Sequence, residues 1–316
     1  MSVFTLLERA ELEAFVAPYG LGRLLDFQGI AAGTENSNFF VSLEAGEYVL
    51  TLVERGQRAD LPFVVELLQR LHAAGLPVPY GVATRSGECL RELADKPALL
   101  QPRLAGKHIE QPNAHHCAEV GSWLARMHLC TQAQPLERRS DRGLDWMLSE
   151  GPLQALQLDD EALELLRASL AEVAQAQAAV LALPRANLHA DLFRDNVLFD
   201  GPHLSGVIDF YNACSGPMLY DVAITLNDWC STASGSLDLS RARALLAAYA
   251  SLRPFHPAEA ERWPCMLRIA CLRFWLSRLI AARQPTALGV QVKDPDEFRQ
   301  RLLQRQQVHL PLPLAL

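Results

Sequence analysis

The feature that most constrains the fold is a pair of segments, residues 188–199 and 207–210. The first reads Leu-His-Ala-Asp-Leu-Phe-Arg-Asp-Asn-Val-Leu-Phe, so a polar centre is followed by an apolar run. The second reads Val-Ile-Asp-Phe, an apolar pair that ends in a carboxylate. The stretch between them begins Asp-Gly-Pro-His, which is typical of a hairpin turn. The pattern therefore predicts a short β-ribbon that brings Asp191, Asn196 and Asp209 to one end.

These three side chains form the set that phosphoryl transfer to an alcohol requires. A carboxylate such as Asp191 can accept the proton of the attacking hydroxyl, and the oxygens of Asn196 and Asp209 can hold Mg²⁺ against nucleotide phosphates. Neither His-x-Asp nor Ile-Asp-Phe is informative alone, but their order and spacing, with an apolar strand after the Asn, make a specific signal. The alternative is that the loop Asp and Asn only cap a turn.

Three neighbouring residues have weaker signals. Arg194 lies three residues after Asp191 and is a candidate catalytic residue that would neutralise the γ-phosphate. It is equally well explained as a surface arginine whose stem covers apolar side chains. Asp221 stands at the start of an apolar helical stretch, where its carboxylate is expected to brace the catalytic loop. His189 is likewise expected to support the loop rather than to move a proton.

The composition excludes several other classes of protein. The 316 residues carry a net charge of −7, which disfavours bulk attraction to nucleic acid or to an anionic membrane. The seven cysteines are odd in number and lack Cys-x-x-Cys spacing, which favours reduced thiols in a cytoplasmic protein over disulfides or zinc. No signal peptide and no apolar run of about 18 residues is found. The sequence does not decide between a monomer and a homo-oligomer.

The chain is expected to form two lobes, an N-terminal nucleotide-covering lobe at 1–102 and a C-terminal catalytic and substrate lobe at 103–316. The first lobe should contain an antiparallel sheet, because its apolar segments alternate and are separated by turn residues. Its expected elements are a helix at 5–17 capped by Thr5, strands at 39–43, 48–53, 80–84, 88–93 and 97–103, and a helix at 61–75. The second lobe should be mainly helical.

A glycine-bearing loop at 29–38 precedes the first of these strands. Its backbone N–H groups and short polar side chains can cover nucleotide phosphates, although it lacks the full Gly-x-Gly-x-x-Gly pattern and an ordinary β-turn is the alternative. The backbone at the end of the 97–103 strand is expected to meet the adenine. The candidate nucleotide-binding residues are Gly33, Asn36, Ser37, Asn38, Leu100 and Pro102.

The catalytic segments resemble the catalytic loop and metal-binding Asp of the protein-kinase-like fold, and most closely those of the aminoglycoside phosphotransferase family. Within that family, four further segments are similar to the homoserine kinases: 29–39, 48–55, 205–211 and 220–227. The likeness runs from about Phe4 to Leu303. It implies a two-lobed α+β fold, ATP and Mg²⁺ as cofactors, and L-homoserine as the acceptor, with phosphate contact by the glycine-bearing loop.

One position departs from the kinase pattern. The third strand should carry a lysine that pairs with the α- and β-phosphates and with a helix glutamate, but Thr51 stands there and Glu66 is left without that partner. Arg55 lies about 13 Å further along the strand, too far for a simple exchange. The similar homoserine kinases also look to have Thr at this point, which favours a different phosphate clamp. The alternative is a nucleotide-binding pseudokinase.

The expected elements of the second lobe do not by themselves decide which alcohol is the phosphoryl acceptor. Helices are expected at 114–128 and 159–181, after Asp221, and in the tail at 242–250, 258–282 and 295–304. A zwitterion such as homoserine needs a cation for its carboxylate and an acid for its amine, whereas an aminoglycoside needs an acidic pocket. The rivals to homoserine are choline, an aminoglycoside and a methylthio-sugar.

Overall fold

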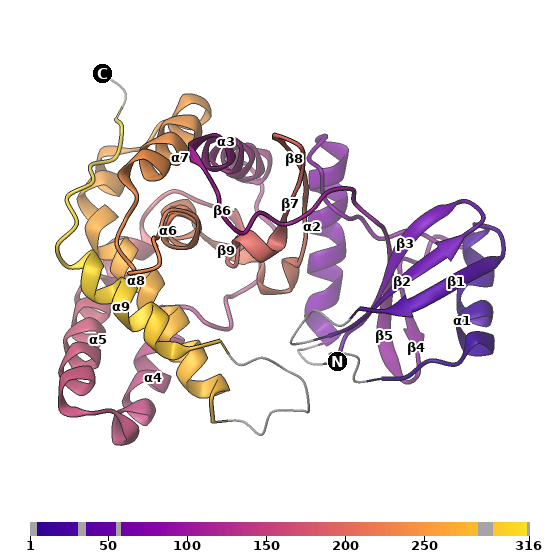
Figure 1. The fold of residues 1–316 in the computed structure, drawn as a ribbon, viewed down its shortest axis with the longest axis horizontal. Coiled ribbons are helices and arrows are strands. Elements are labelled where there is room, and N and C mark those ends of the chain that lie inside the picture. The colour runs from indigo at the N-terminus through magenta and orange to yellow at the C-terminus, as the bar shows by residue number, and fades with distance from the viewer. Residues whose placement is uncertain (1–4, 31–35, 55–57, 284–292, 315–316) are drawn as a thin grey trace. The chain divides into compact units, whose positions relative to one another are not determined.

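The computed structural model describes residues 5–30, 36–54, 58–283 and 293–314, which form two compact units (Figure 1). The first unit contains the described residues up to Ala105 together with Gly206–Tyr211. The second contains the remaining described residues. Two positions discussed above, Gly33 and Arg55, lie outside the described residues.

An antiparallel sheet of five strands, in the order β1-β2-β3-β5-β4, forms the centre of the first unit. Its strands are β1 (Leu24–Gly29), β2 (Ser37–Leu43), β3 (Gly46–Leu52), β4 (Leu90–Leu93) and β5 (Lys96–Pro102). Every second residue of β2 is buried, which is the period-2 alternation of a strand with one face on a core. The strands predicted at 39–43, 48–53 and 97–103 are confirmed.

Two helices accompany this sheet. Leu12 and Phe15 of α1 (Arg9–Val16) join Leu100 of β5 in one buried apolar cluster, so α1 covers one face of the sheet (Figure 1). Gln101 follows Leu100 and therefore points to the opposite face. There it lines a small hollow with Val64 and Leu68 of α2 (Leu61–Ala73), which fixes α2 to that side. The predicted helix at 61–75 is confirmed.

Three local expectations for the first unit differ from the structure. The first helix begins at Arg9 with Glu8 as its N-cap, and not at Thr5, because the Thr5 hydroxyl donates instead to Glu54 at 2.6 Å. Residues 80–84 form no strand. Strand β1 has no counterpart among the predictions, since Leu24 is its one buried residue and no alternation marks it in the sequence.

The second unit is mainly helical, as predicted. Its helices are α3 (Ala114–Thr131), α4 (Leu144–Gln154), α5 (Asp160–Leu181), α6 (Met218–Trp229), α7 (Leu239–Leu252), α8 (Pro257–Ala281) and α9 (Pro295–Arg305). All residues of α6 are buried, so this helix lies at the centre of the unit and the others surround it (Figure 1). None of the described helices is both long and apolar enough to span a membrane.

Two short strand pairs carry the segments that the sequence singled out. Strand β6 (Arg185–Leu188) leads into the His-Ala-Asp loop and pairs with β9 (Cys214–Pro217). Strands β7 (Val197–Asp200) and β8 (His203–Val207) form a two-stranded sheet. Gly201 supplies the left-handed backbone of the intervening turn with φ of 57°. The predicted hairpin is therefore confirmed.

Candidate active site

The loop after β6 is held by one buried carboxylate. Asp221, in the first turn of α6, accepts the backbone N–H of His189 at 2.7 Å and that of Ala190 at 2.9 Å. His128 of α3 lies 3.2 Å from the same carboxylate through Nε2. Ala190 has φ of 60°, a conformation that is costly for a residue other than glycine and needs such support. These are the contacts that a bracing role for Asp221 requires.

The charge of Asp221 is stabilised in spite of its burial. Burial alone acts to raise the pKa of this carboxyl, but the hydrogen bond and the electrostatic influence of His128, with the contacts from His189, hold the pKa below its usual value. A carboxylate at the first turn of a helix also interacts favourably with the helix dipole. Asp221 therefore connects α3, α6 and the loop through its ionised form.

We expect Asp221→Ala to lower the free energy of unfolding by about 3–5 kcal/mol, as when one partner of a buried charged contact is removed. Because the folded pKa is lowered, the contribution of Asp221 is present above the ordinary pKa of about 4 and is lost as pH falls through the folded value. Urea denaturation at pH 7 and near pH 3.5 measures both effects. Glu164→Ala removes an exposed carboxylate from α5 and should change little. Equal losses in both variants would contradict this role.

Asp191, the predicted base, lies in this loop with contacts on both sides of its carboxylate. Asn212 donates Nδ2 to Asp191 Oδ2 at 3.2 Å, and Arg273 Nη1 lies 3.9 Å from Oδ1. The side chain is 23% exposed, so it remains reachable by a small molecule. Burial raises the pKa of Asp191, while the Arg273 charge acts to lower it. A partly buried carboxylate with one tethered oxygen is suited to accept a proton.

Asn196 is positioned by the same loop. It ends the 3₁₀ helix Arg194–Asn196, and its Nδ2 donates to the Asp191 carbonyl at 2.9 Å. The amide nitrogen is therefore directed into the loop, which leaves Oδ1 as the atom that a cation would use. An amide oxygen is an acceptable ligand for a hard divalent ion such as Mg²⁺. The residue thus fits the role predicted for it.

Asp209 belongs to the first unit, where it follows β8. Its φ of 65° makes it, like Ala190, a residue other than glycine in a left-handed conformation. Such conformations cost about 1–3 kcal/mol each and are concentrated at functional sites. Burial and the nearby Asp209 carboxylate both raise the pKa of Tyr211. Asp209 and Tyr211 line a hollow of about 20 Å³ together with Gln101, whose side chain is anchored at 2.9 Å to the Pro79 carbonyl.

The residues predicted to contact nucleotide phosphates are engaged within the sheet. Asn36 Oδ1 accepts the Glu54 N–H at 3.2 Å, and the Ser37 hydroxyl, which is fully buried, donates to Glu54 at 2.5 Å. Asn38 Oδ1 accepts the Thr51 hydroxyl at 2.7 Å across the β2–β3 pair. The hydroxyl of Ser37 is thus committed to Glu54, and phosphate contact by Gly33, Asn36, Ser37 and Asn38 stays a prediction.

Leu100 and Pro102, the predicted adenine contacts, lie on β5. The Leu100 carbonyl accepts the Val82 N–H at 2.8 Å, and Pro102 pairs with Tyr48 at the end of the β3–β5 ladder. Adenine contact by this stretch remains a prediction.

In the kinase pattern, Glu66 would be the helix glutamate that pairs with the strand lysine, for which Thr51 stands here. In this structure Glu66 forms an ion pair with Arg70, one helical turn away, at 2.5 Å.

Sequence reasoning missed a partly buried ion pair at one end of the sheet. Lys96 contacts Glu54, which also accepts the hydroxyls of Thr5 and Ser37. Burial acts to raise the pKa of Glu54, but these hydrogen bonds and the Lys96 charge lower it below its usual value. Lys96 is one of only three lysines in the chain, which is the one signal that could have drawn attention to it.

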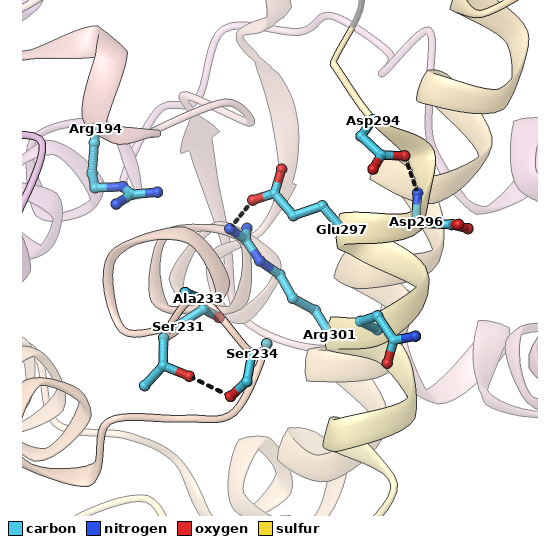
Figure 2. Close-up of a pocket in the computed structure, with 11 residues that line it drawn as sticks. Arg194, Ser231, Ala233, Ser234, Asp294, Asp296, Glu297 and Arg301 are labelled. Carbon is cyan, nitrogen blue, oxygen red and sulfur yellow. Dashed lines mark hydrogen bonds and ion pairs between the residues drawn. The ribbon is translucent and has the colours of Figure 1, made fainter.

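Arg194 lies in the second unit beside a pocket of about 640 Å³ (Figure 2). Its Nε donates to Asp228 at 3.1 Å and its Nη1 to the Glu110 carbonyl at 3.1 Å. The other charged lining residues include Glu297 and Arg301 of α9, which form an ion pair with each other. Arg194 is therefore an anchored residue, and neutralisation of a phosphate would require it to exchange one of these contacts.

Comparison with known proteins identifies the family. The family model described as "Phosphotransferase enzyme family" matches residues 26–255. This chain belongs to that phosphotransferase family. The homoserine kinase of Pseudomonas aeruginosa strain UCBPP-PA14 is 67% identical to this phosphotransferase over 316 residues, which is 100% of both chains. The homoserine kinase of Methylobacillus flagellatus is 43% identical over 96% of this chain and 94% of its own. The resemblance drawn from the sequence motifs is confirmed.

Solved structures support the fold of the phosphotransferase. An amicoumacin kinase in complex with AMP-PNP, Ca²⁺ and Ami has a TM-score of 0.70 at 15% identity, covering 95% of this chain and 92% of that one. An aminoglycoside phosphotransferase from Alicyclobacillus acidocaldarius has a TM-score of 0.65 at 18% identity, covering 96% and 95%. Identities this low show the fold alone, and the predicted α+β kinase-like fold is confirmed.

Proposed function

We propose that this phosphotransferase transfers the γ-phosphoryl group of ATP to the hydroxyl of L-homoserine, giving O-phospho-L-homoserine and ADP, a reaction that belongs to threonine biosynthesis. The observation that carries the proposal is the 67% identity to a homoserine kinase along the entire length of both chains. The loop that presents Asp191 supplies the group that such a transfer needs. A biosynthetic enzyme of this kind would act in the cytoplasm.

In this proposal Asp191 orients the homoserine hydroxyl and accepts its proton as the oxygen attacks the γ-phosphorus. Asn212 holds Asp191 Oδ2, so that Oδ1 is the oxygen suited to face the acceptor. Asp221 fixes the loop backbone, and with it the position of the base. The protein thus contributes mainly by positioning the acceptor and by stabilising charge.

The oxygens of Asn196 and Asp209 are the proposed ligands of Mg²⁺. Both are hard donors, and the Asn196 amide is held by its nitrogen, so the donor chemistry fits this ion. When bound, Mg²⁺ neutralises charge on the nucleotide phosphates. Arg194 is proposed to add positive charge near the transferred group, and the backbone at Leu100 and Pro102 is proposed to meet the adenine.

A panel of acceptors tests the proposed substrate. We expect kcat/KM for L-homoserine to exceed the values for choline, an aminoglycoside and a methylthio-sugar by at least about 100-fold, the discrimination expected when a site built for polar groups of one substrate meets a ligand without them. ATP consumption coupled to ADP detection measures each rate. If another member of the panel had a higher kcat/KM, that compound and not L-homoserine would be the preferred acceptor.

We expect Thr51→Ala to lower kcat by no more than about tenfold, the effect of one neutral hydrogen bond. The Thr51 hydroxyl donates to Asn38 Oδ1. Its loss therefore removes a neutral hydrogen bond within the sheet and does not remove a charged contact to the nucleotide phosphates. Steady-state kinetics with saturating Mg·ATP and homoserine measure the change. Ser42→Ala, which removes an exposed β2 hydroxyl that donates to Glu47, is the matched control. A dead Thr51→Ala enzyme that still folds would mean that Thr51 itself carries the phosphate clamp.

A further inference from the structure

Near the proposed base, two buried side chains of the second unit each have one polar atom without a hydrogen-bond partner among the described residues. Arg273 of α8 is 3% exposed, and Tyr220 of α6 is 7% exposed. Among the described residues, neither the Arg273 Nη1 nor the Tyr220 hydroxyl makes a hydrogen bond. A buried donor without a partner costs about 1–3 kcal/mol, more when it is charged. Each such donor calls for an explanation, such as an ordered water, an ion or a bound ligand.

Both groups lie in the neighbourhood of Asp191. Arg273 Nη1 lies 3.9 Å from Asp191 Oδ1, beyond hydrogen-bond distance but close enough for an ion pair. The phenol of Tyr220 is near enough to Arg273 and Asp191 for all three to influence one another electrostatically. Helices α6 and α8, which carry the two donors, pack together in the centre of the unit (Figure 1). The donors and the base therefore belong to one cluster within a single unit.

The protonation states of this cluster favour an anion. Burial lowers the pKa of Arg273, but a guanidinium remains charged in proteins. Burial raises the pKa of Tyr220, so its hydroxyl stays protonated and can donate. Burial also raises the pKa of the neighbouring Cys214 thiol to about 11, so this group adds no negative charge. Arg273 thus places one fixed cation 3.9 Å from Asp191. Tyr220 supplies one hydroxyl donor in the same surroundings, where Asp191 and Asp221 are the carboxylates that influence it.

We propose that Arg273 and Tyr220 bind the carboxylate of the amino-acid acceptor while Asp191 receives its hydroxyl. The inference rests on the proposed function and names the groups that would make the site specific for an acceptor with a carboxylate. Guanidinium and phenol donors together suit a carboxylate, because the planar guanidinium can donate two N–H groups. Three carbon atoms separate the hydroxyl oxygen of homoserine from its carboxyl carbon, so both ends can be held by neighbouring side chains.

The bound carboxylate would also change the surroundings of the base. Without acceptor, Arg273 has Asp191 as its counter-charge. With acceptor bound, the substrate carboxylate would share that cation, and the acceptor would be held beside Asp191. An acceptor without a carboxylate would lack this anchor.

The test compares L-homoserine with 3-amino-1-propanol, which has the same hydroxyl and amine but no carboxylate. The readout is the ratio of kcat/KM for the two acceptors in each enzyme. We expect the wild type to prefer homoserine by about 100-fold or more, the scale of a charge-assisted contact. Arg273→Gln should remove most of that preference, Arg273→Lys should retain part of it, and Tyr220→Phe should reduce it by about tenfold or less.

The control is Arg268→Gln, which removes another arginine of α8 whose partner is Glu172 of α5. Its ratio should equal that of the wild type. Homoserine binding by calorimetry, with a non-hydrolysable ATP analogue present, tests variants that have lost turnover, and far-UV circular dichroism checks their fold. A folded Arg273→Gln enzyme that loses both acceptors by the same factor would overturn the inference, because Arg273 would then act only through Asp191.

Two different wild-type results separate an error in the carboxylate site from an error in the proposed function. If the wild type phosphorylates homoserine and 3-amino-1-propanol equally well, the carboxylate has no recognition site and the inference is wrong, while homoserine phosphorylation stands. If the wild type phosphorylates no homoserine at all, the proposed function itself is wrong and the inference falls with it.

Discussion

Asp191→Asn is expected to lower kcat by about 10²–10⁴, the usual effect of removing a general base. The substitution keeps the shape of the side chain and its neighbours Asn212 and Arg273, so the fold and Mg·ATP binding should be retained. An amide cannot accept the hydroxyl proton as a carboxylate does. The loss should therefore fall on kcat, with a much smaller change in KM for ATP.

The matched control for this variant is Asp195→Asn in the same loop. Asp195 is exposed and pairs with Lys293 at 2.7 Å, so its loss should leave turnover within a few-fold of the wild type. Steady-state kinetics and nucleotide titration of both variants give the comparison. Turnover of Asp191→Asn at the wild-type rate would remove Asp191 from the mechanism.

Asp209→Ala is expected to abolish measurable turnover, because it removes a proposed ligand of the divalent cation. Residues 207–210 contain no second carboxylate that could replace it. Asn196→Ala should have a smaller effect and shift the dependence of kcat to higher Mg²⁺ concentration. Titrating Mg²⁺ at saturating ATP and homoserine separates the two variants. Asp200→Ala removes an exposed carboxylate of the hairpin turn and serves as the control. Normal turnover of Asp209→Ala at low Mg²⁺ would place the metal site elsewhere.

The sequence predicted those parts of the site whose geometry is local. The hairpin of β7 and β8 follows from an apolar run, a turn and a second apolar run, all between Val197 and Val207. The contact between Asn196 and the Asp191 carbonyl spans five residues and is likewise a consequence of the loop sequence. Even the bracing carboxylate could be proposed from its position at the start of an apolar helix.

Contacts made across long stretches of chain could not be predicted in the same way. Arg273 reaches Asp191 from a position 82 residues later in the chain. It stands in a long helix that carries several other arginines, so its sequence neighbours give no sign of a site. The ion pair of Lys96 with Glu54 depends on the pairing of the strands. Thr5 was expected to cap α1 because local capping rules favour Thr, yet its hydroxyl binds Glu54 instead. In each case tertiary packing decides the partner.

The identity of the phosphorylated product decides whether this phosphotransferase acts on L-homoserine. Purified wild-type protein should be incubated with Mg·ATP and L-homoserine, and the products followed by ³¹P NMR and mass spectrometry, with Asp191→Asn treated in parallel. We predict that the wild type forms O-phospho-L-homoserine and ADP in equal amounts and that Asp191→Asn forms almost none in the same time. Protein that binds ATP but forms no phosphohomoserine would contradict the account and would favour the pseudokinase alternative raised by Thr51.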